Sequence, residues 1–237
     1  MKLGIFGDSF ATIPEPALHT LIEDVPWMTL VKQHLVCSMK VHSLQGTSLW
    51  FSFEKFMKYH AKYTHIVFCY TDPSRINYMP VHLATHSVVR EVSDIDHTHT
   101  PPGDVAELLA IINAQKIAYN SQLDLFIYQQ IFEKINEICF SKNIKLVNLI
   151  TTNATLDLTN RQGDCLLNLG LLSSKEWISE SSLYYDNRCC HLSKENNIVL
   201  ADIITKSLLN VSQSVLDLEK NSNFVFSKEI SNRYFKI

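Results

Sequence analysis

The sequence predicts an α/β fold, in which helices cover both faces of a parallel sheet. Two observations favour it. Short apolar segments of strand length alternate along the chain with segments of helical spacing, which is typical of strands joined by crossover helices. The strand segments are nearly continuous apolar runs, as expected of strands that are buried on both faces. They are residues 2–6, 39–44, 65–70 and 144–150.

Three of the predicted strands end in polar or glycine-containing segments. The breaks are Gly7-Asp8-Ser9, Gly46-Thr47-Ser48 and Thr71-Asp72. Ligands of open α/β sheets bind beyond the carboxyl ends of the strands. We therefore expect a functional site where these breaks meet.

Helices are predicted between the strands. The first carries Trp27, Leu30, Val31, His34 and Leu35 at helical spacing, and Ser48 is a plausible N-cap for the second. The second has an aromatic stripe that we expect in the core, formed by Trp50, Phe53, Phe56 and Met57. A third covers roughly residues 104–142, and its best stripe is Ile127, Ile131, Ile135 and Ile138. Ser193 caps a final helix that runs to about Leu209.

A single domain over residues 1–211 accounts for this pattern. Residues 72–103 hold four prolines and four of the ten histidines, which indicates a long insertion or lid. Residues 151–180 are expected to be rich in loops. The polar tail at 212–237 carries four aromatic residues, and we expect it to pack on the domain or on a second subunit of a homo-oligomer.

Composition restricts the class of protein. Hydrophobic residues make up 46% of the chain and charged residues 19%, which is typical of soluble globular proteins. The formal net charge of -3 does not favour nucleic acid as a partner. No segment reaches the length of a membrane span. The six cysteines have no CxxC spacing and are interpreted as reduced thiols. The N-terminus lacks the features of a signal peptide, and together these observations indicate a cytoplasmic protein.

Ser9 is the first candidate catalytic residue, because it lies at the mouth of the first predicted strand. A serine hydroxyl needs a base and an oriented partner to act as a nucleophile. On its own, Ser9 is better explained as the cap of a following helix. The two interpretations stay open at this point.

The second candidate segment is the run from Asp186 to Ser193, just before the last predicted helix. It contains a carboxylate and His191, the arrangement in which an acid orients an imidazole that acts as a base. A solvent-exposed histidine near a helix N-terminus is the alternative. Asp186 is the preferred acid, and Asp164 is a weaker candidate.

Taken together, the two segments resemble the SGNH (GDSL-like) hydrolase family. The resemblance rests on Gly7-Asp8-Ser9-Phe10 after an N-terminal strand, and on an acid followed by His191-Leu192-Ser193 before a C-terminal helix. It implies a three-layer α/β/α sandwich with a flavodoxin-like parallel sheet. It also implies a serine esterase in which Ser9 is the nucleophile, His191 the base and Gly46 part of the oxyanion hole.

The sequence departs from the family pattern at two places. The family spacing is Asp-x-x-His, but Arg188 occupies that position, so Asp186 must reach His191 from five residues away. Asp72 stands where the family has an oxyanion-hole asparagine, and an ionised carboxylate donates no hydrogen bond. Arg75 or Thr71 replaces the missing donor in our preferred hypothesis. Otherwise the backbone amides at Ser9 and Gly46 suffice, or activity is weak.

The expected substrate is an acyl ester, either a small molecule or an ester of a carbohydrate or lipid. The alternative is a binding module that keeps the fold and not the catalysis. No cofactor is expected, because the chain has no Walker A, GxGxxG or HExxH motif. No metal is expected either, since the segment from Asp94 to His99 has suitable side chains but no established zinc spacing.

Overall fold

The structure is a computed structural model of the 237-residue chain. It describes residues 1–12, 25–44, 47–71, 76–77, 84–85, 121–151, 165–168, 192, 194–209, 214–217 and 224. Within these ranges, only the backbone is described for Ser9, Ser121 and Lys194 and for the short strands β4, β5, β7 and β8.

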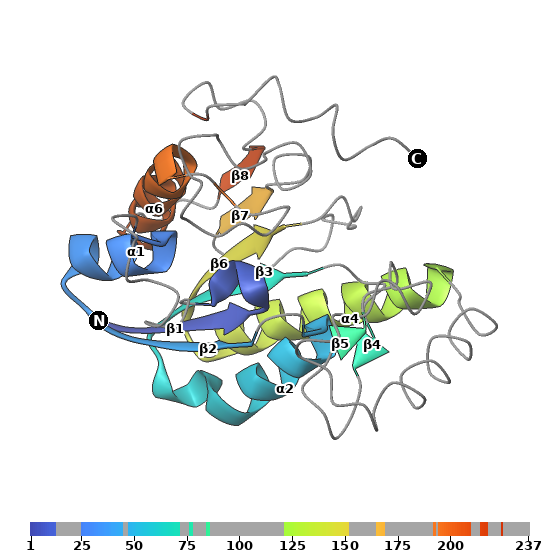
Figure 1. Cartoon of the computed structure of the whole chain (residues 1–237). Helices are drawn as coiled ribbons and strands as arrows, with labels where there is room; N and C mark the ends of the chain where they lie inside the picture. Colours follow the sequence, from blue (N-terminus) through green and yellow to red (C-terminus); the bar gives the residue numbers. More distant parts are fainter. Residues whose placement is uncertain are drawn as a thin grey trace, which may run out of the picture.

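The centre of the fold is a six-stranded sheet with the strand order β2-β1-β3-β6-β7-β8 (Figure 1). All neighbouring strands in it are parallel. This order, with the first strand between the second and the third, is that of a flavodoxin-like sheet. The strands are β1 (Lys2–Gly7), β2 (Ser38–Ser43), β3 (His65–Tyr70), β6 (Lys145–Ile150), β7 (Cys165–Asn168) and β8 (Ser214–Asp217).

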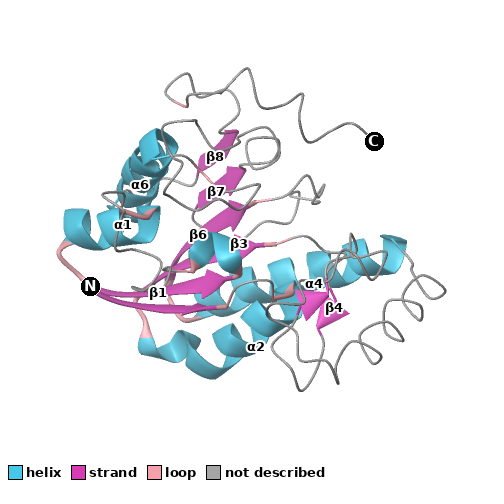
Figure 2. Cartoon of the chain, in the orientation of Figure 1, coloured by secondary structure: helices cyan, strands magenta, loops and turns pink. Residues whose placement is uncertain are grey.

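Helices α1 (Trp27–Leu35) and α6 (Lys194–Leu209) cover one face of the sheet (Figure 2). Alternate residues of the strands point to opposite faces of a sheet. On this face they form one hydrophobic core with the two helices, and the sheet contributes Leu3, Ile5, Val67, Cys69, Val147 and Leu149. Phe224 from the C-terminal region is buried in the same core.

Helices α2 (Leu49–Tyr59) and α4 (Ser121–Ser141) cover the opposite face. The sheet contributes the other alternate set here, namely Phe6, Ile66, Phe68, Tyr70, Leu146 and Ile150. A short 3-10 helix, η3 (His60–Lys62), follows α2 directly. The predicted three-layer α/β/α sandwich with a parallel flavodoxin-like sheet is therefore confirmed.

Several elements match the sequence prediction closely. Strand β3 covers the predicted residues 65–70. The Ser48 side chain accepts a hydrogen bond from the Phe51 backbone N–H at 3.3 Å, as expected of an N-cap. Ser193, the predicted cap of α6, lies outside the described residues, as do residues 104–120 of the predicted third helix.

Two short strands were missed. Strand β7 lies within the region 151–180 that we expected to be loop-rich, and β8 lies beyond residue 211, in the predicted tail. Each has only four residues, too few for a periodic pattern. Since β8 pairs with β7, the sheet extends into the region assigned to the tail.

Two helical stripes were wrong in part. Ile127 is 41% exposed, and the buried face of α4 is instead Tyr128, Ile131, Phe132, Ile135 and Cys139. Two steps of four residues, from 127 to 135, drift by about 80° around a helix, so Ile127 leaves the face that Ile135 occupies. On α2, Trp50 and Met57 are exposed, and the buried face is Leu49, Ser52 and Phe56.

The predicted insertion at 72–103 contains a two-stranded antiparallel ladder, β4 (Ile76–Asn77) with β5 (Ala84–Thr85). The other residues of the insertion lie outside the described residues. In the part of the chain that is described, no helix is long and apolar enough to cross a membrane.

Candidate active site

The backbone turns sharply at the carboxyl end of β1, where the 3-10 helix η1 (Ser9–Ala11) begins. The Ala11 N–H donates to the Asp8 carbonyl oxygen at 3.1 Å and closes this turn. Gly7 permits the tight packing beneath it. A Cβ atom on Gly7 would lie 2.8 Å from Cys69 Cβ and 2.9 Å from Ala11 Cβ. The glycine that precedes Asp8 and Ser9 is therefore required by packing.

Asp8 is a buried carboxylate that holds this turn against the sheet. Its Oδ1 accepts a hydrogen bond from the Phe10 N–H at 3.0 Å. Its Oδ2 accepts one from the Thr71 hydroxyl at 2.6 Å. Asp8 thus connects the ends of the two neighbouring strands β1 and β3. Ser9 lies between Asp8 and Phe10 in the sequence, so its backbone is held on both sides.

Thr71 was one of the predicted oxyanion-hole donors. A threonine hydroxyl carries a single hydrogen, and that hydrogen is directed to Asp8. In this arrangement the Thr71 side chain positions Asp8 and is not free to donate to an oxyanion. The structure thus gives Thr71 a supporting role in the turn, and its role in an oxyanion hole stays a prediction.

A second set of hydrogen bonds ties η1 to the edge strand β2. The Ser43 hydroxyl donates to the Ala11 carbonyl oxygen at 3.0 Å. The Thr12 hydroxyl lies 3.2 Å from the Ser43 hydroxyl oxygen and also donates to the Asp8 carbonyl oxygen at 2.9 Å. Because β1, β2 and β3 all contribute, the backbone of η1 is held by three strand ends.

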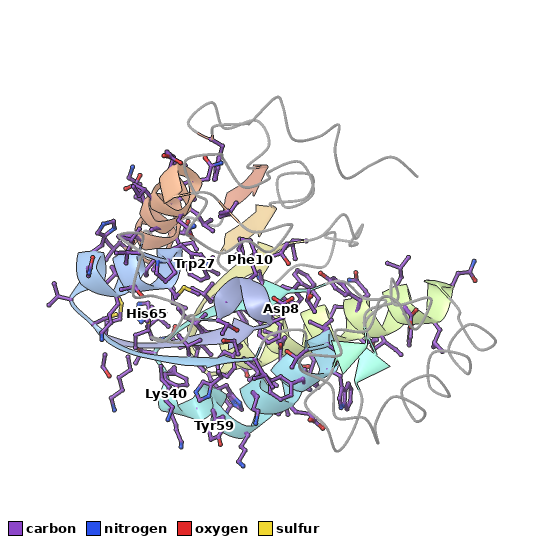
Figure 3. All side chains as sticks on the ribbon, viewed as in Figure 1. Asp8, Phe10, Trp27, Lys40, Tyr59 and His65 are labelled. Carbon is purple, nitrogen blue, oxygen red and sulfur yellow. The ribbon has the colours of Figure 1, made fainter. Side chains whose placement is uncertain are left out.

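A buried chain of hydrogen bonds runs from η1 to the start of α6. The Trp27 indole Nε1–H donates to the Phe10 carbonyl oxygen at 3.1 Å, and the Trp27 backbone N–H donates to Asn197 Oδ1 at 3.0 Å. The Asn197 Nδ2 group donates to the Leu192 carbonyl oxygen at 2.9 Å. Figure 3 shows Phe10 and Trp27 near Asp8 at this end of the sheet.

Asn197 also explains how α1 begins. Pro26, the N-cap residue of α1, makes no side-chain capping bond. The first N–H groups of a helix lack intrahelical partners and need an outside acceptor. Asn197 of α6 supplies one for Trp27, across 170 residues of sequence. This cap from another helix fixes α1 and α6 relative to each other.

The hydrogen bonds of Trp27 and Asn197 link the two predicted catalytic segments. Phe10 follows Ser9 directly, and Leu192 follows His191 directly. Leu192 is buried in the same core as Phe10 and Trp27. Three hydrogen bonds through two buried side chains therefore connect the neighbours of the proposed nucleophile and the proposed base.

Most of the predicted site residues are not themselves described. The Ser9 side chain lies outside the described residues, and so do Gly46, Asp72, Arg75, Asp164, Asp186 and His191. The triad and the oxyanion hole remain predictions.

Sequence reasoning missed the residues that build this support. Asp8 was noted only as a member of the Gly7-Asp8-Ser9-Phe10 segment, and Trp27 only as part of a helical stripe. Neither Asn197 nor Ser43 was singled out. Asparagine is favoured at the N-cap of a helix, where backbone groups need partners, but Asn197 lies inside the first turn of α6, so this preference gives only a weak signal.

One titratable group packed against the turn, in the part of the chain that is described, is the Cys69 thiol. Burial, with a smaller contribution from the charge of Asp8, raises the pKa of the Cys69 thiol well above its usual value, so this cysteine stays protonated. Among the described residues, no group of three or more His, Cys, Asp or Glu side chains is placed to hold a metal ion. The segment from Asp94 to His99 lies outside those residues.

Comparison with known proteins gave similarities to solved structures alone. No protein-family model and no curated protein matched the sequence. The chain is similar to a crystal structure of the psychrotrophic esterase EstA from Pseudoalteromonas sp., inhibited by monoethylphosphonate. The identity is 11%, the TM-score is 0.44, and the similarity covers 88% of this chain and 96% of the esterase chain. The fold assignment rests on the strand order and the two cores described above.

Proposed function

We propose that this protein is a serine hydrolase that cleaves an acyl ester, with Ser9 as nucleophile, His191 as base and Asp186 as the acid that orients it. One observation carries the proposal: the buried connection from Phe10 through Trp27 and Asn197 to Leu192. It restrains the backbone next to Ser9 and next to His191 at the carboxyl end of a parallel sheet, where α/β proteins bind ligands. The resemblance of both segments to SGNH hydrolases supplies the reaction class.

The proposed reaction is acyl transfer in two steps. His191 removes the Ser9 hydroxyl proton as the oxygen attacks the ester carbonyl carbon, and a tetrahedral intermediate forms. As the intermediate collapses, the bond to the alcohol breaks, and His191 gives the proton to the departing oxygen. Water then attacks the acyl-enzyme in the same way, so the carboxylic acid leaves and Ser9 is regenerated.

The backbone N–H groups of Ser9 and Gly46 are the proposed donors to the oxyanion, and Arg75 is the proposed third donor in place of the absent asparagine. The Thr71 hydroxyl donates to Asp8, which supports Arg75 rather than Thr71 as this donor. Loss of one oxyanion donor lowers kcat by about 10²- to 10³-fold. Arg75→Ala is therefore expected to lower kcat within this range, and an unchanged kcat would remove Arg75 from the hole.

The substrate class follows from the reaction class and from the family resemblance. An acyl ester of a carbohydrate, a lipid or another small molecule is proposed, with an acetyl group as one candidate for the acyl part. The insertion at 72–103 is the proposed source of selectivity, because it directly follows β3 at the carboxyl end of the sheet.

A fluorophosphonate probe tests the nucleophile directly, because it reacts covalently with activated serines. We expect labelling of the wild type and of Ser38→Ala, whose serine is exposed at the start of β2. Ser9→Ala and His191→Ala are expected to lose labelling. Asp186→Asn is expected to react slowly, and the variants should hydrolyse p-nitrophenyl acetate in the same rank order.

The outcomes separate the two functions considered. If wild type and Ser9→Ala both remain unlabelled while folded, as judged by circular dichroism, the chain is a binding module with a hydrolase-like fold. If Ser9→Ala is labelled as fast as the wild type, another serine is the nucleophile and the proposal is wrong.

A further inference from the structure

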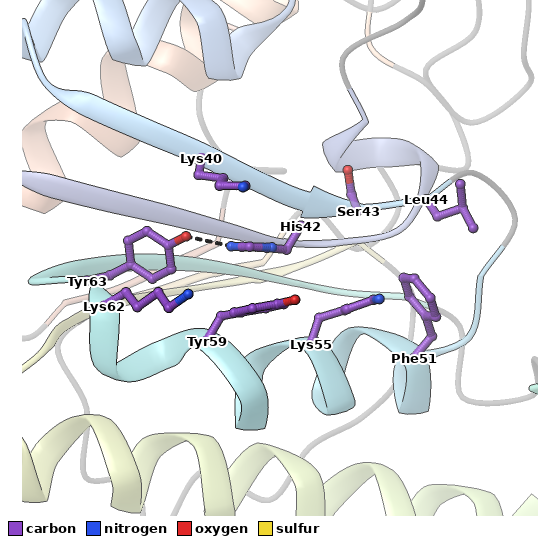
Figure 4. A pocket seen from close by; sticks show the side chains of 9 residues that line it. All are labelled: Lys40, His42, Ser43, Leu44, Phe51, Lys55, Tyr59, Lys62 and Tyr63. Carbon is purple, nitrogen blue, oxygen red and sulfur yellow. Dashed lines mark hydrogen bonds between the residues drawn. The ribbon is translucent and has the colours of Figure 1, made fainter.

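A second site lies at the edge of the sheet, between the edge strand β2 and helix α2 with η3 (Figure 4). It is a pocket with a volume of about 560 Å³. None of the residues assigned to the proposed hydrolase reaction is among the residues that line it. The pocket therefore needs its own explanation.

The periodicities of the two elements build this pocket. On β2, Lys40 and His42 alternate with Met39 and Val41, which pack against the other core, so Lys40 and His42 point toward α2. Leu44, directly after β2, also lines the pocket. On α2, Phe51, Lys55 and Tyr59 recur every four residues and form one stripe along the helix. The two sets face each other across the pocket.

His42 is fixed by aromatic neighbours in the middle of the pocket. Its imidazole stacks on the Tyr59 ring, with a centroid distance of 4.6 Å and an angle of 12°. Its Nε2 atom is 2.5 Å from the Tyr63 hydroxyl. Gly4 on β1 leaves space for Tyr63, since a Cβ atom there would lie 2.5 Å from Tyr63 Cδ2. The wall of the pocket is thus preorganised.

Three lysines, Lys40, Lys55 and Lys62, add positive charge to this wall. Lys55 lies over the Phe51 ring with its Nζ 4.9 Å from the centroid, and Lys62 lies over the Tyr59 ring at the same distance. Figure 4 shows their side chains, with that of Lys40, extending along the space between β2 and α2. Cation–π contacts hold the ammonium groups without neutralising them.

Negative charge does not offset these lysines within the described part of the chain. None of the residues that line the pocket carries a carboxylate. Glu54 lies beside Lys55 in sequence, but its carboxylate accepts a hydrogen bond from the exposed Trp50 indole at 3.1 Å and is not part of the lining. A chain with a net charge of -3 therefore carries a concentrated positive site at one edge of its sheet.

We propose that this pocket binds a small anion with more than one negative charge, of the phosphate class. The three ammonium groups match a multiply charged anion better than a single carboxylate, and the aromatic walls lower the local dielectric and strengthen the attraction. Lys40 comes from the strand, Lys55 from the helix and Lys62 from η3, so three elements contribute positive charge to the lining of the pocket.

His42 provides an internal reporter. Burial, together with the charges of Lys40, Lys55 and Lys62, lowers its pKa to about 4, so the imidazole is neutral near pH 7. A bound anion adds negative charge beside it and favours the protonated form. Binding should therefore raise the pKa of His42 in a nuclear magnetic resonance titration, while an equal ionic strength of sodium chloride should not raise it to the same extent.

Isothermal titration of the full chain with inorganic phosphate, pyrophosphate and glycerol phosphate tests the proposal. We expect pyrophosphate to bind more tightly than inorganic phosphate, because it carries more charge. Each of Lys40→Gln, Lys55→Gln and Lys62→Gln should raise the Kd by about two- to fivefold, as expected of a partly exposed charge pair. The triple variant should show no measurable binding.

Lys32→Gln is the matched control, since Lys32 is an exposed lysine on α1, on the opposite face of the sheet. Its Kd should equal that of the wild type. The proposal is overturned if the wild type binds none of the three anions at millimolar concentration, or if Lys32→Gln weakens binding as much as the pocket variants do. Tighter binding of glycerol phosphate than of inorganic phosphate would identify an organic phosphate as the ligand.

Binding is independent of the proposed hydrolase. Ser9→Ala should bind the same anions with unchanged Kd, whatever its effect on fluorophosphonate labelling. Failure of one proposal therefore leaves the other to be judged by its own measurement.

Discussion

Trp27 and Asn197 join two helices that are far apart in the sequence, through a hydrogen bond of 3.0 Å from the Trp27 backbone N–H to the Asn197 side-chain oxygen. Both residues use their remaining polar groups to hold the backbone, at Phe10 and at Leu192. This pair therefore links the start of the chain to its C-terminal third. The chemistry proposed for Ser9 and His191 depends on that link.

Trp27→Phe tests the link. The change removes the indole N–H that donates to Phe10, and we expect a loss of about 1 to 3 kcal/mol in the free energy of unfolding, measured with urea. If the hydrolase proposal holds, kcat should fall more than KM changes. Trp50→Phe is the matched control, because Trp50 is exposed and its indole bonds only to Glu54 among the described residues. Equal losses in the two variants would contradict this role.

Thr71→Val tests the support of Asp8. Valine has the shape of threonine and lacks the hydroxyl, so Asp8 loses the donor at 2.6 Å. A lost hydrogen bond to a charged group costs about 1.5 to 3 kcal/mol. Urea unfolding should show this loss, whereas Thr29→Val on α1 should change stability little. A neutral effect of Thr71→Val would show that Asp8 does not depend on this donor.

Gly7→Ala tests the packing beneath η1. The added methyl group meets Cys69 Cβ and Ala11 Cβ at less than 3 Å, and overpacking of this kind costs about 1 to 3 kcal/mol. Thermal unfolding should show a lower Tm. Adding Ala11→Gly removes one of the two contacts and should restore part of the loss. No recovery would indicate that Cys69 alone resists the change.

Asn148→Ala tests a buried polar bridge between β3, β6 and α4. Asn148 accepts from the Tyr70 hydroxyl at 2.9 Å and donates to Asn136 Oδ1 at 3.0 Å. Its loss should cost about 2 to 4 kcal/mol, because two buried groups lose a partner. Tyr70→Phe removes one of those groups, so the double variant should be less destabilised than the sum, with a coupling of about 0.5 to 3 kcal/mol. Additive effects would contradict the bridge.

His42 predicts a pH dependence of stability. Its pKa in the folded protein is lowered to about 4 from the usual 6.5, so between these values the unfolded chain binds more protons than the folded one. Stability should fall as the pH decreases from about 6.5 toward 4, and no contribution is expected above that window. His42→Phe should show a weaker decrease between pH 7 and 5 in urea unfolding. An unchanged slope in this variant would exclude His42 as the cause.

Local sequence patterns were sufficient to predict an element where every residue of the segment favours the same structure. Strand β3 was predicted to the residue, since all of residues 65–70 are apolar or aromatic except His65 at its start. The N-cap at Ser48 was predicted for the same reason, because the signal lies within three residues. Stripes on helices were less secure: Ile127 and Trp50 are hydrophobic, yet both are exposed.

The candidate site, too, has a part that was predicted from the sequence and a part that was not. Ser9 and His191 were selected from short local segments that resemble a family, and their chemistry was derived from residue type. The support beneath them, in Asp8, Thr71, Trp27 and Asn197, was not predicted. Each of these side chains bonds to a partner that is assigned by folding, and the spacing between Asp8 and Thr71 already spans 63 residues.

The sequence alone determined the alternation of strands and helices, and with it the parallel sheet covered on both faces. Each strand or helix is recognised from the spacing of apolar residues within one continuous segment of the chain. Only the tertiary structure decided which polar side chains meet: Trp27 with Asn197, Asp8 with Thr71, and the lysines of β2, α2 and η3 around His42. Hydrogen bonds and charges act over a few ångströms, so their partners are set by the packing of distant segments and are not encoded in any local period.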